Sequence, residues 1–270
     1  MTYKEVLAEA MQSIESLDAE VLLAHVLGVS REYIIVHKSN HISLDDGVLF
    51  RNLVDRRIKN EPLAYIIQKK EFYGREFFVN QHVLIPRPET EELIDLLLLR
   101  VQNKTLRVVD VGTGSGCIAI TLSMEGFLHV SASDISHDAL QVAQKNAQMY
   151  KREIVWKEGC FLEPYQEEKI DILIANLPYV PQSSEKNMMK DVLDYEPHLA
   201  LFGGENGDQC YYDLICDIQK HPEIQYCFFE VDHTHAYSLL ATYRENIPFL
   251  HWEIKQDLSQ KNRFLYGEKF

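Results

Sequence analysis

The chain has 270 residues, of which 46% are apolar, and its 41 acidic and 27 basic residues give a formal charge of −14. This length allows one large domain or two ordinary ones, and the acidic surface repels a phosphate backbone, so we expect a basic protein partner and no direct DNA binding. No apolar run approaches the ~20 residues of a membrane span, and the start, MTYKEVLAEA, lacks the apolar stretch of a secretory signal, so we expect a cytoplasmic protein without membrane association.

The first 75 residues have apolar side chains at helical spacing. Gly28 predicts the end of one helix, and Ser30 is a suitable N-cap for the next. Another helix is expected over 44–59, with Ser43 as its cap. We therefore expect residues 1–75 to form a small helical bundle that grips a partner or shapes a cleft, because it contains no catalytic constellation.

The pattern changes between Glu71 and Leu84, where aromatic and β-branched residues surround Gly74. This composition predicts a β-hairpin. Thr90 then lies just ahead of an expected helix. We assign 76–90 to the hairpin and linker, and 91–270 to a second domain.

Strands and helices alternate in this second domain, which predicts a parallel sheet with right-handed crossovers. The expected strands are 106–111, 128–133, 154–156, 170–175, 226–231, 251–256 and 263–267. The expected helices include 116–124, 137–150, 209–220 and 235–246. The loop 257–262 is too short for a helical crossover, so the last two strands should pair antiparallel.

A glycine-rich segment, VVDVGTGSG at 108–116, joins the first strand of this domain to its helix. Gly112 permits a tight turn, and Gly114 lets a ligand approach the backbone closely. The following helix directs free N–H groups and its positive end at that ligand. Asp134 ends the second strand, 24 residues after Asp110, where a carboxylate can accept hydrogen bonds from ribose hydroxyls.

The spacing of this loop favours one nucleoside cofactor over others. A glycine-rich turn alone is also compatible with a purely structural link, but the strand context and Asp134 favour a cofactor. The glycines follow GxGxG and not the GxGxxG of dinucleotide binders. Asp110 would repel a pyrophosphate but could hold an amino group. S-adenosylmethionine has an ammonium and no phosphate, so it fits best.

The fourth strand delivers Asn176, Leu177, Pro178 and Tyr179 at its carboxyl end, where ligands bind in open α/β sheets. These residues could form a plain turn. They could also hold a planar NH₂ group, because the Asn176 side-chain oxygen and the Leu177 carbonyl can each accept one N–H. Pro178 would stiffen the turn, and Tyr179 would offer a ring face. Orientation and electrostatics could then carry methyl transfer without a dedicated general base.

The sequence offers no complete set of metal ligands, so we expect no metal site. His233 and His235 lack a nearby third ligand. The five cysteines contain no CxxC pair and are expected to be reduced thiols.

At these two motifs the chain resembles the release-factor glutamine N5-methyltransferase family, and the resemblance covers almost its whole length. Besides DVGTGSG and NLPY, the similar stretches are EPLAYI at 61–66, EFYG at 71–74, IPRPETEEL at 85–93, EPHLALFGGENG at 196–207 and DLSQKNRFLYG at 257–267. The resemblance implies a Rossmann-like, seven-stranded methyltransferase sheet with an antiparallel last strand, preceded by the helical bundle and hairpin.

The resemblance also implies an activity and a site. A methyl group would pass from S-adenosylmethionine, leaving S-adenosylhomocysteine, to the glutamine of a Gly-Gly-Gln loop in class 1 peptide chain release factors. The helical bundle would contact the release factor. The cofactor would lie along Gly112, Thr113, Gly114, Ser115 and Gly116, with Asp110 and Asn176 beside it, its ribose on Asp134 and its adenine against Phe161.

Three positions depart from the family pattern. Leu177 stands where proline is usual, so the loop gains an N–H while keeping its carbonyl. Cys160 stands where aspartate is common, so this position lacks the carboxylate that the family pattern implies as a polar contact for the adenine. Asp232 replaces a usual glycine.

Other functions compete with this one. An N6-adenine nucleic-acid methyltransferase could hold an exocyclic amine in the same corner, but it must also extract its base and grip phosphates. A non-catalytic partner-binding protein with a cofactor-shaped fold is a second alternative, which the intact Asn176 and Asp134 disfavour. A nicotinamide oxidoreductase is a third, and it predicts dinucleotide binding.

Overall fold

The computed structural model describes residues 1–269, which divide into two compact units. The first unit contains Met1–Lys69 together with the separate segment Met189–Tyr195. The second contains Lys70–Met188 and the chain from Glu196 onward. The glycine-rich loop and the Asn-Leu-Pro-Tyr segment both lie in the second unit, so this unit holds the candidate site. The return of 189–195 to the first unit is not visible in local sequence patterns.

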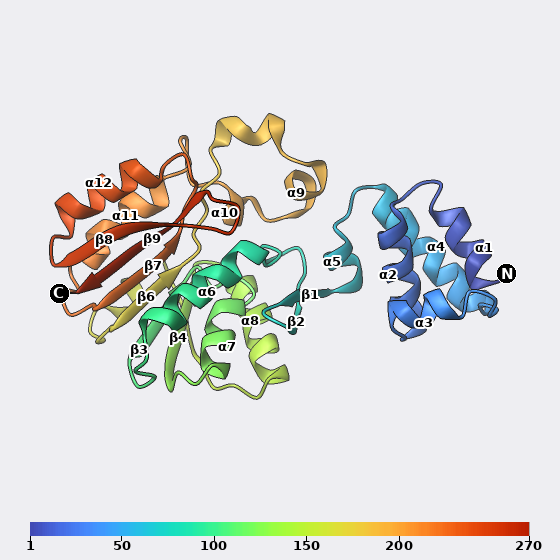
Figure 1. Ribbon diagram of the computed structural model, residues 1–270, viewed down its shortest axis with the longest axis horizontal. Helices are drawn as coiled ribbons and strands as arrows, with labels where there is room; N and C mark the ends of the chain where they lie inside the picture. The colour runs from blue at the N-terminus through green and yellow to red at the C-terminus, as the bar shows by residue number, and fades with distance from the viewer. Residues whose placement is uncertain (270) are drawn as a thin grey trace. The chain divides into compact units, whose positions relative to one another are not determined.

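The first five helices of the first unit contribute apolar residues to one core, to which the sixth, Lys190–Tyr195, adds no buried residue. Figure 1 shows the arrangement of these helices. Ser30 and Ser43 cap helices as the sequence predicts, accepting the N–H of the third helical residue in each case. Gly28 is the C-cap of the preceding helix. The Tyr195 hydroxyl donates to the Lys59 carbonyl at 2.9 Å and so ties the last helix to this unit. The helices are α1 (Tyr3–Ala10), α2 (Ser16–Leu27), α3 (Arg31–Val36), α4 (Leu44–Ile58), α5 (Leu63–Ile67) and α9 (Lys190–Tyr195).

Seven strands form the main sheet of the second unit in the order β5-β4-β3-β6-β7-β9-β8 (Figure 1). The five neighbouring strands from β5 to β7 in this order are paired in parallel, and β9 pairs antiparallel with both β7 and β8. The seven expected strands and the antiparallel terminal pair are therefore confirmed. The strands are β3 (Arg107–Val111), β4 (His129–Asp134), β5 (Val155–Glu158), β6 (Ile172–Ala175), β7 (Tyr226–Glu230), β8 (Leu250–Gln256) and β9 (Asn262–Lys269).

Helices cover both faces of this sheet. In β6, Ile172 and Ile174 join a core with α6, α7 and α8, whereas Leu173 and Ala175 join a core with α11 and α12. This division follows from the two-residue repeat of a strand, and burial on both faces explains the unbroken apolar run of β6. The helical segments are α6 (Pro88–Arg100), α7 (Cys117–Met124), α8 (His137–Met149), η1 (Glu163–Tyr165), η2 (Gln182–Asn187), α10 (His198–Leu201), α11 (Gln209–Ile218) and α12 (Ala236–Asn246).

Two local expectations need correction. The hairpin is shorter and earlier than predicted, with strands β1 (Lys69–Phe72) and β2 (Arg75–Phe78) around a turn at Tyr73 and Gly74. The second strand ends because Asn80 closes a turn, its side-chain oxygen accepting the His82 N–H at 3.0 Å. Helix α6 begins at Pro88, so Thr90 lies inside its first turn and not ahead of it. Proline suits that first position, because the N–H it lacks would be unpaired there.

Within residues 1–269, none of the helices has the length and apolar character needed to cross a membrane.

Candidate active site

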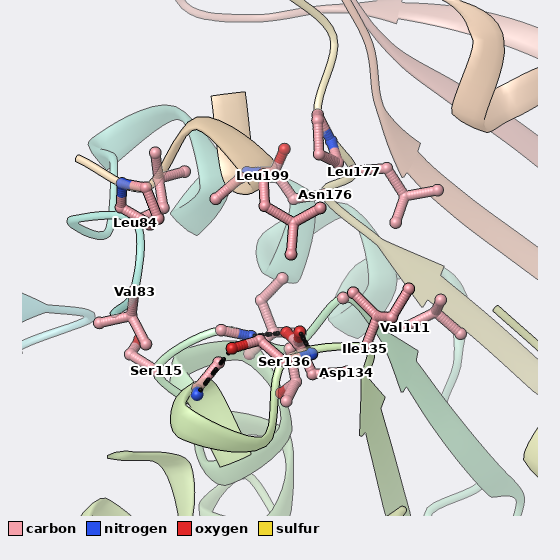
Figure 2. Close-up of a pocket in the computed structure, with 18 of the residues that line it drawn as sticks. Val83, Leu84, Val111, Ser115, Asp134, Ile135, Ser136, Asn176, Leu177 and Leu199 are labelled. Atoms are coloured by element: carbon pink, nitrogen blue, oxygen red, sulfur yellow. Dashed lines mark hydrogen bonds between the residues drawn. The ribbon is translucent and has the colours of Figure 1, made fainter. Parts of the chain in front are cut away.

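A cavity of about 270 Å³ lies at the carboxyl ends of the central strands of the second unit (Figure 2). Segments far apart in the sequence meet in its wall, as expected at this edge of a parallel sheet. The predicted site residues that line it are Gly112, Thr113, Gly114, Ser115, Asp134, Phe161, Asn176, Leu177 and Pro178. Asp110, Gly116 and Tyr179 are not part of this wall. The structure therefore brings the glycine-rich loop and the Asn-Leu-Pro corner together in one site.

The glycine-rich loop turns sharply at Gly112, whose φ is +70°. Its N–H donates to the Ser133 carbonyl at 2.9 Å, which fixes the loop against β4. A Cβ atom at Gly112 would lie 2.9 Å from the Leu177 side chain. Only glycine satisfies both the backbone angle and this close contact.

Asp134 holds the loop from the neighbouring strand. Its two carboxylate oxygens accept the N–H groups of Gly114 and Ser136, each at 2.9 Å (Figure 2). Burial raises the pKa of Asp134 above its usual value. Each carboxylate oxygen can accept more than one hydrogen bond, so Asp134 still has acceptor capacity on the cavity side.

Asp110 is placed differently from the expectation of direct contact with a cofactor amino group. Its carboxyl group is fully buried beneath the loop, where one oxygen accepts the Thr113 hydroxyl at 2.6 Å and the Ala119 N–H at 3.2 Å. The other oxygen has no hydrogen-bond partner among the described residues. Burial raises the pKa of Asp110 to about 7. Asp110 therefore braces the loop and the start of α7 from below.

Asn146 on α8 connects the glycine-rich loop to the hairpin. Its side-chain NH₂ donates to the Ser115 carbonyl at 2.8 Å and to the Phe78 carbonyl at 3.0 Å. Its side-chain oxygen accepts the Phe78 N–H at 2.7 Å. Asn146 is fully buried, so these three bonds fix the backbone at Ser115 without help from water. No local sequence pattern predicts this role, because a single asparagine in a helix has many uses.

Asn176 leaves the carboxyl end of β6 and lines the cavity (Figure 2). Its side-chain NH₂ donates to the Thr90 hydroxyl at 2.9 Å, and that hydroxyl donates to the Glu230 carboxylate at 2.7 Å. The Asn176 oxygen is therefore the end of the carboxamide that is left to accept hydrogen bonds from a ligand. Thr90 and Glu230 were not predicted as site residues. An available signal was the position of Glu230 at the carboxyl end of β7, next to β6.

The N–H that Leu177 has, and that a proline at this position would lack, is hydrogen-bonded inside the protein. This N–H donates to the hydroxyl of the fully buried Tyr211 at 3.0 Å, and that hydroxyl in turn donates to the Glu230 carbonyl. The extra N–H is thus satisfied in a dry environment, where an unpaired donor would be unfavourable. The Leu177 side chain packs on Gly112, so its backbone remains positioned.

The loop after Leu177 is clamped by the segment that contains Gly203. Val180 forms a parallel bridge with Phe202, and the Gly203 N–H donates to the Val180 carbonyl at 3.0 Å. A Cβ atom at Gly203 would lie only 2.4 Å from the Pro178 carbonyl oxygen. The close approach of two backbones accounts for glycine here and holds Pro178 against the cavity.

Tyr179 does not present its ring to the cavity as expected. Its hydroxyl donates to the second oxygen of Glu230 at 3.0 Å. Glu230 is fully buried, and burial raises its pKa, although hydrogen bonds from Thr90 and Tyr179 and the charge of Arg263 oppose that rise. Tyr179 therefore supports the corner from behind.

Of the two remaining departures, Cys160 is part of the cavity wall and Asp232 is not. Cys160 and Phe161 both line the cavity, and Phe161 has a φ of +45°. The Ser133 hydroxyl donates to the Phe161 carbonyl at 3.3 Å and stabilises this turn. Asp232 accepts the Thr234 N–H at 2.8 Å, so its side chain closes the turn that precedes α12.

Comparison with known proteins supports the assignment of both units. Residues 2–67 match the family model described as PrmC N-terminal domain, and residues 90–201 match Methyltransferase small domain. A release factor glutamine methyltransferase of Leptospira interrogans is 39% identical over 92% of this chain and 89% of its own length. The one of Bacillus anthracis is 34% identical over 92% of this chain and 91% of its own.

A solved methyltransferase of Pyrococcus furiosus superposes on 81% of this chain and 98% of its own, with a TM-score of 0.53 at 14% identity, and so shares the fold. The seven-stranded sheet, its glycine-rich loop and these matches define the protein as a methyltransferase. The chain belongs to the release factor glutamine methyltransferase family.

Proposed function

We propose that this enzyme transfers a methyl group from S-adenosylmethionine to the side-chain amide nitrogen, N5, of the glutamine in the Gly-Gly-Gln motif of class 1 release factors. One observation carries this proposal. The Asn176 NH₂ is bonded to Thr90, so the Asn176 oxygen lies free beside the main chain of Leu177. Two oxygen acceptors side by side suit a group with two N–H donors, as a primary amide has.

The residues of the cavity fit S-adenosylmethionine. Asp134 would accept the ribose hydroxyls, Phe161 would lie against the adenine, and the backbone of 112–115 would follow the amino-acid part. Arg87 is the only Lys or Arg in the described wall, and its guanidinium is paired with the buried Glu196 at 2.6 Å. A wall with so little free positive charge suits a cofactor without phosphates. When bound, the cofactor supplies a methyl group on a sulfonium centre.

The corner itself supplies orientation. An amide nitrogen is a weak nucleophile because its lone pair is delocalised into the carbonyl. Acceptance of both N–H groups by Asn176 and by the Leu177 carbonyl fixes the nitrogen and increases its electron density. Fixing a reactant in this way accounts for a large part of many enzymatic rates. One amide proton is released to water after the nitrogen has gained the methyl group.

The organisation of the chain supports a protein substrate. We assign the role of recognising the release factor to the helical unit, and the formal charge of −14 favours a basic partner. Release factors act at ribosomes, so we place the enzyme in the cytoplasm.

Mass measurement of the Gly-Gly-Gln peptide tests the proposal. A release factor incubated with enzyme and cofactor should gain one methyl group on that glutamine, and a Gly-Gly-Ala variant should gain none. Asn176→Ala should nearly abolish transfer while cofactor binding, measured by calorimetry, stays within about threefold. A parallel reaction with DNA tests the N6-adenine alternative. Methyl groups found on DNA and absent from the release factor would reject the proposed substrate.

A further inference from the structure

A chain of polar side chains lies directly behind Asn176, and its members come from three separate elements. Thr90 belongs to α6, Glu230 ends β7, and Tyr179 follows β6. Thr90 and Glu230 are buried, with 3% and 0% of their surface exposed. The bonds run from Asn176 to Thr90 at 2.9 Å, from Thr90 to Glu230 at 2.7 Å, and from Tyr179 to Glu230 at 3.0 Å.

The direction of these bonds is set by the carboxylate. Glu230 accepts one hydroxyl on each of its two oxygens, from Thr90 at 2.7 Å and from Tyr179 at 3.0 Å, so both oxygens are in use as acceptors. The Thr90 proton is therefore committed to Glu230. The Thr90 oxygen can then only accept from Asn176, which brings the Asn176 NH₂ to Thr90 and turns the Asn176 oxygen away from it.

The opposite orientation of Asn176 would prevent binding of a primary amide. If the carboxamide were reversed, its NH₂ would face the NH₂ of the substrate, and two donors would oppose each other. Its oxygen would also compete with Glu230 for the single Thr90 proton. A buried carboxylate that loses one of its donors is strongly destabilised. The bond from Asn176 to Thr90 and the bond from Thr90 to Glu230 therefore depend on each other.

We propose that Thr90 and Glu230 are positioning residues that hold Asn176 with its oxygen directed at the target amide nitrogen. This inference rests on the proposed function. Glu230 lies outside the cavity wall, and Thr90, which is part of that wall, has its hydroxyl bonded to Asn176 and Glu230. They act through Asn176. Because the Asn176 oxygen is an acceptor, this arrangement favours a substrate amide or amine that donates N–H groups over a substrate group that only accepts hydrogen bonds.

Substitutions at Thr90 separate this role from simple packing. Thr90→Val keeps nearly the same shape but removes the hydroxyl, so Asn176 can rotate. We expect kcat for release-factor methylation to fall roughly 100-fold, the loss typical of a misplaced reacting group, while KM for S-adenosylmethionine changes less than about twofold. Thr90→Ser keeps the hydroxyl and should retain kcat within about threefold.

Thr121→Val is a matched control. Thr121 is also fully buried, lies on α7 in the same unit, and its hydroxyl has no hydrogen-bond partner among the described residues. The same loss of a hydroxyl should leave kcat unchanged there. A drop in kcat for Thr121→Val equal to that for Thr90→Val would show a general packing effect and overturn the proposal.

Glu230→Gln provides a second, independent test if Thr90→Val folds poorly. The amide can present its oxygen to only one of the two hydroxyls, so the pairing that orients Asn176 is weakened, and kcat should fall at least about tenfold. Wild-type kcat in either folded variant, or equal losses in Thr90→Ser and Thr90→Val, would reject the positioning role. Absence of glutamine methylation by the unaltered enzyme would instead reject the proposed function itself.

Discussion

The buried carboxyl group of Asp110 should make the second unit less stable as the pH rises. Burial raises its pKa from 3.8 to about 7, whereas the unfolded chain ionises this group near the lower value. Between these two values the native state holds one proton more than the unfolded state. The free energy of unfolding therefore falls as pH rises through this window and becomes constant above it.

The size of this effect follows from the shift in pKa. Each pKa unit corresponds to ~1.4 kcal/mol, so a shift from 3.8 to about 7 amounts to about 4 kcal/mol in total. Of this, about 2–3 kcal/mol should appear between roughly pH 5 and pH 8. Asp110→Asn cannot ionise and should lack this decline, although its unpaired NH₂ lowers the stability at every pH.

Urea unfolding followed by tryptophan fluorescence measures this effect, because Trp156 and Trp252, the two tryptophans of the chain, both lie in the second unit. The experiment compares the wild-type protein with Asp110→Asn at several pH values, without cofactor. Glu245→Gln is the control, since Glu245 is exposed on α12 and undergoes the same chemical change. Parallel pH curves for wild type and Asp110→Asn would refute the reasoning.

Three further predictions concern the same site. Tyr211→Phe leaves the Leu177 N–H unpaired and should lower the free energy of unfolding by about 1–3 kcal/mol. Combining it with Leu177→Pro should recover part of that loss in a double-mutant cycle. Stability losses that simply add in the double variant would contradict this prediction. Asn146→Ala removes three buried bonds and should cost about 2–4 kcal/mol in urea unfolding. Asp134→Ala should weaken cofactor binding at least about tenfold by calorimetry, and unchanged binding would exclude its proposed contact with the ribose.

Sequence patterns predicted most of the fold because its elements have strong local signals. The seven strands, their order along the chain and the antiparallel last pair follow from apolar runs and loop lengths. The meeting of the glycine-rich loop with Asn176 follows from the rule that parallel strands end at one edge. Element ends were less certain, as the early start of α6 at Pro88 shows.

The support behind the site could not be predicted in the same way. Thr90, Tyr211 and Glu230 meet only after β7 has joined the sheet and α6 and α11 have packed on it, and no local pattern encodes those distances. The position of Asp110 below the loop was missed for a related reason. A sequence shows that an acidic residue precedes the glycines, but the tertiary fold decides which way its side chain faces.

The hydrogen bond between Leu177 and Tyr211 couples the residues that are favourable at these two positions. A proline at 177 would have no N–H, and the Tyr211 hydroxyl would then lose this donor while keeping its bond to the Glu230 carbonyl. With leucine at 177, by contrast, a phenylalanine at 211 leaves the N–H without its acceptor. The residue at 177 thus sets how much the loss of the hydroxyl at 211 costs, which makes the two positions evolutionarily interdependent.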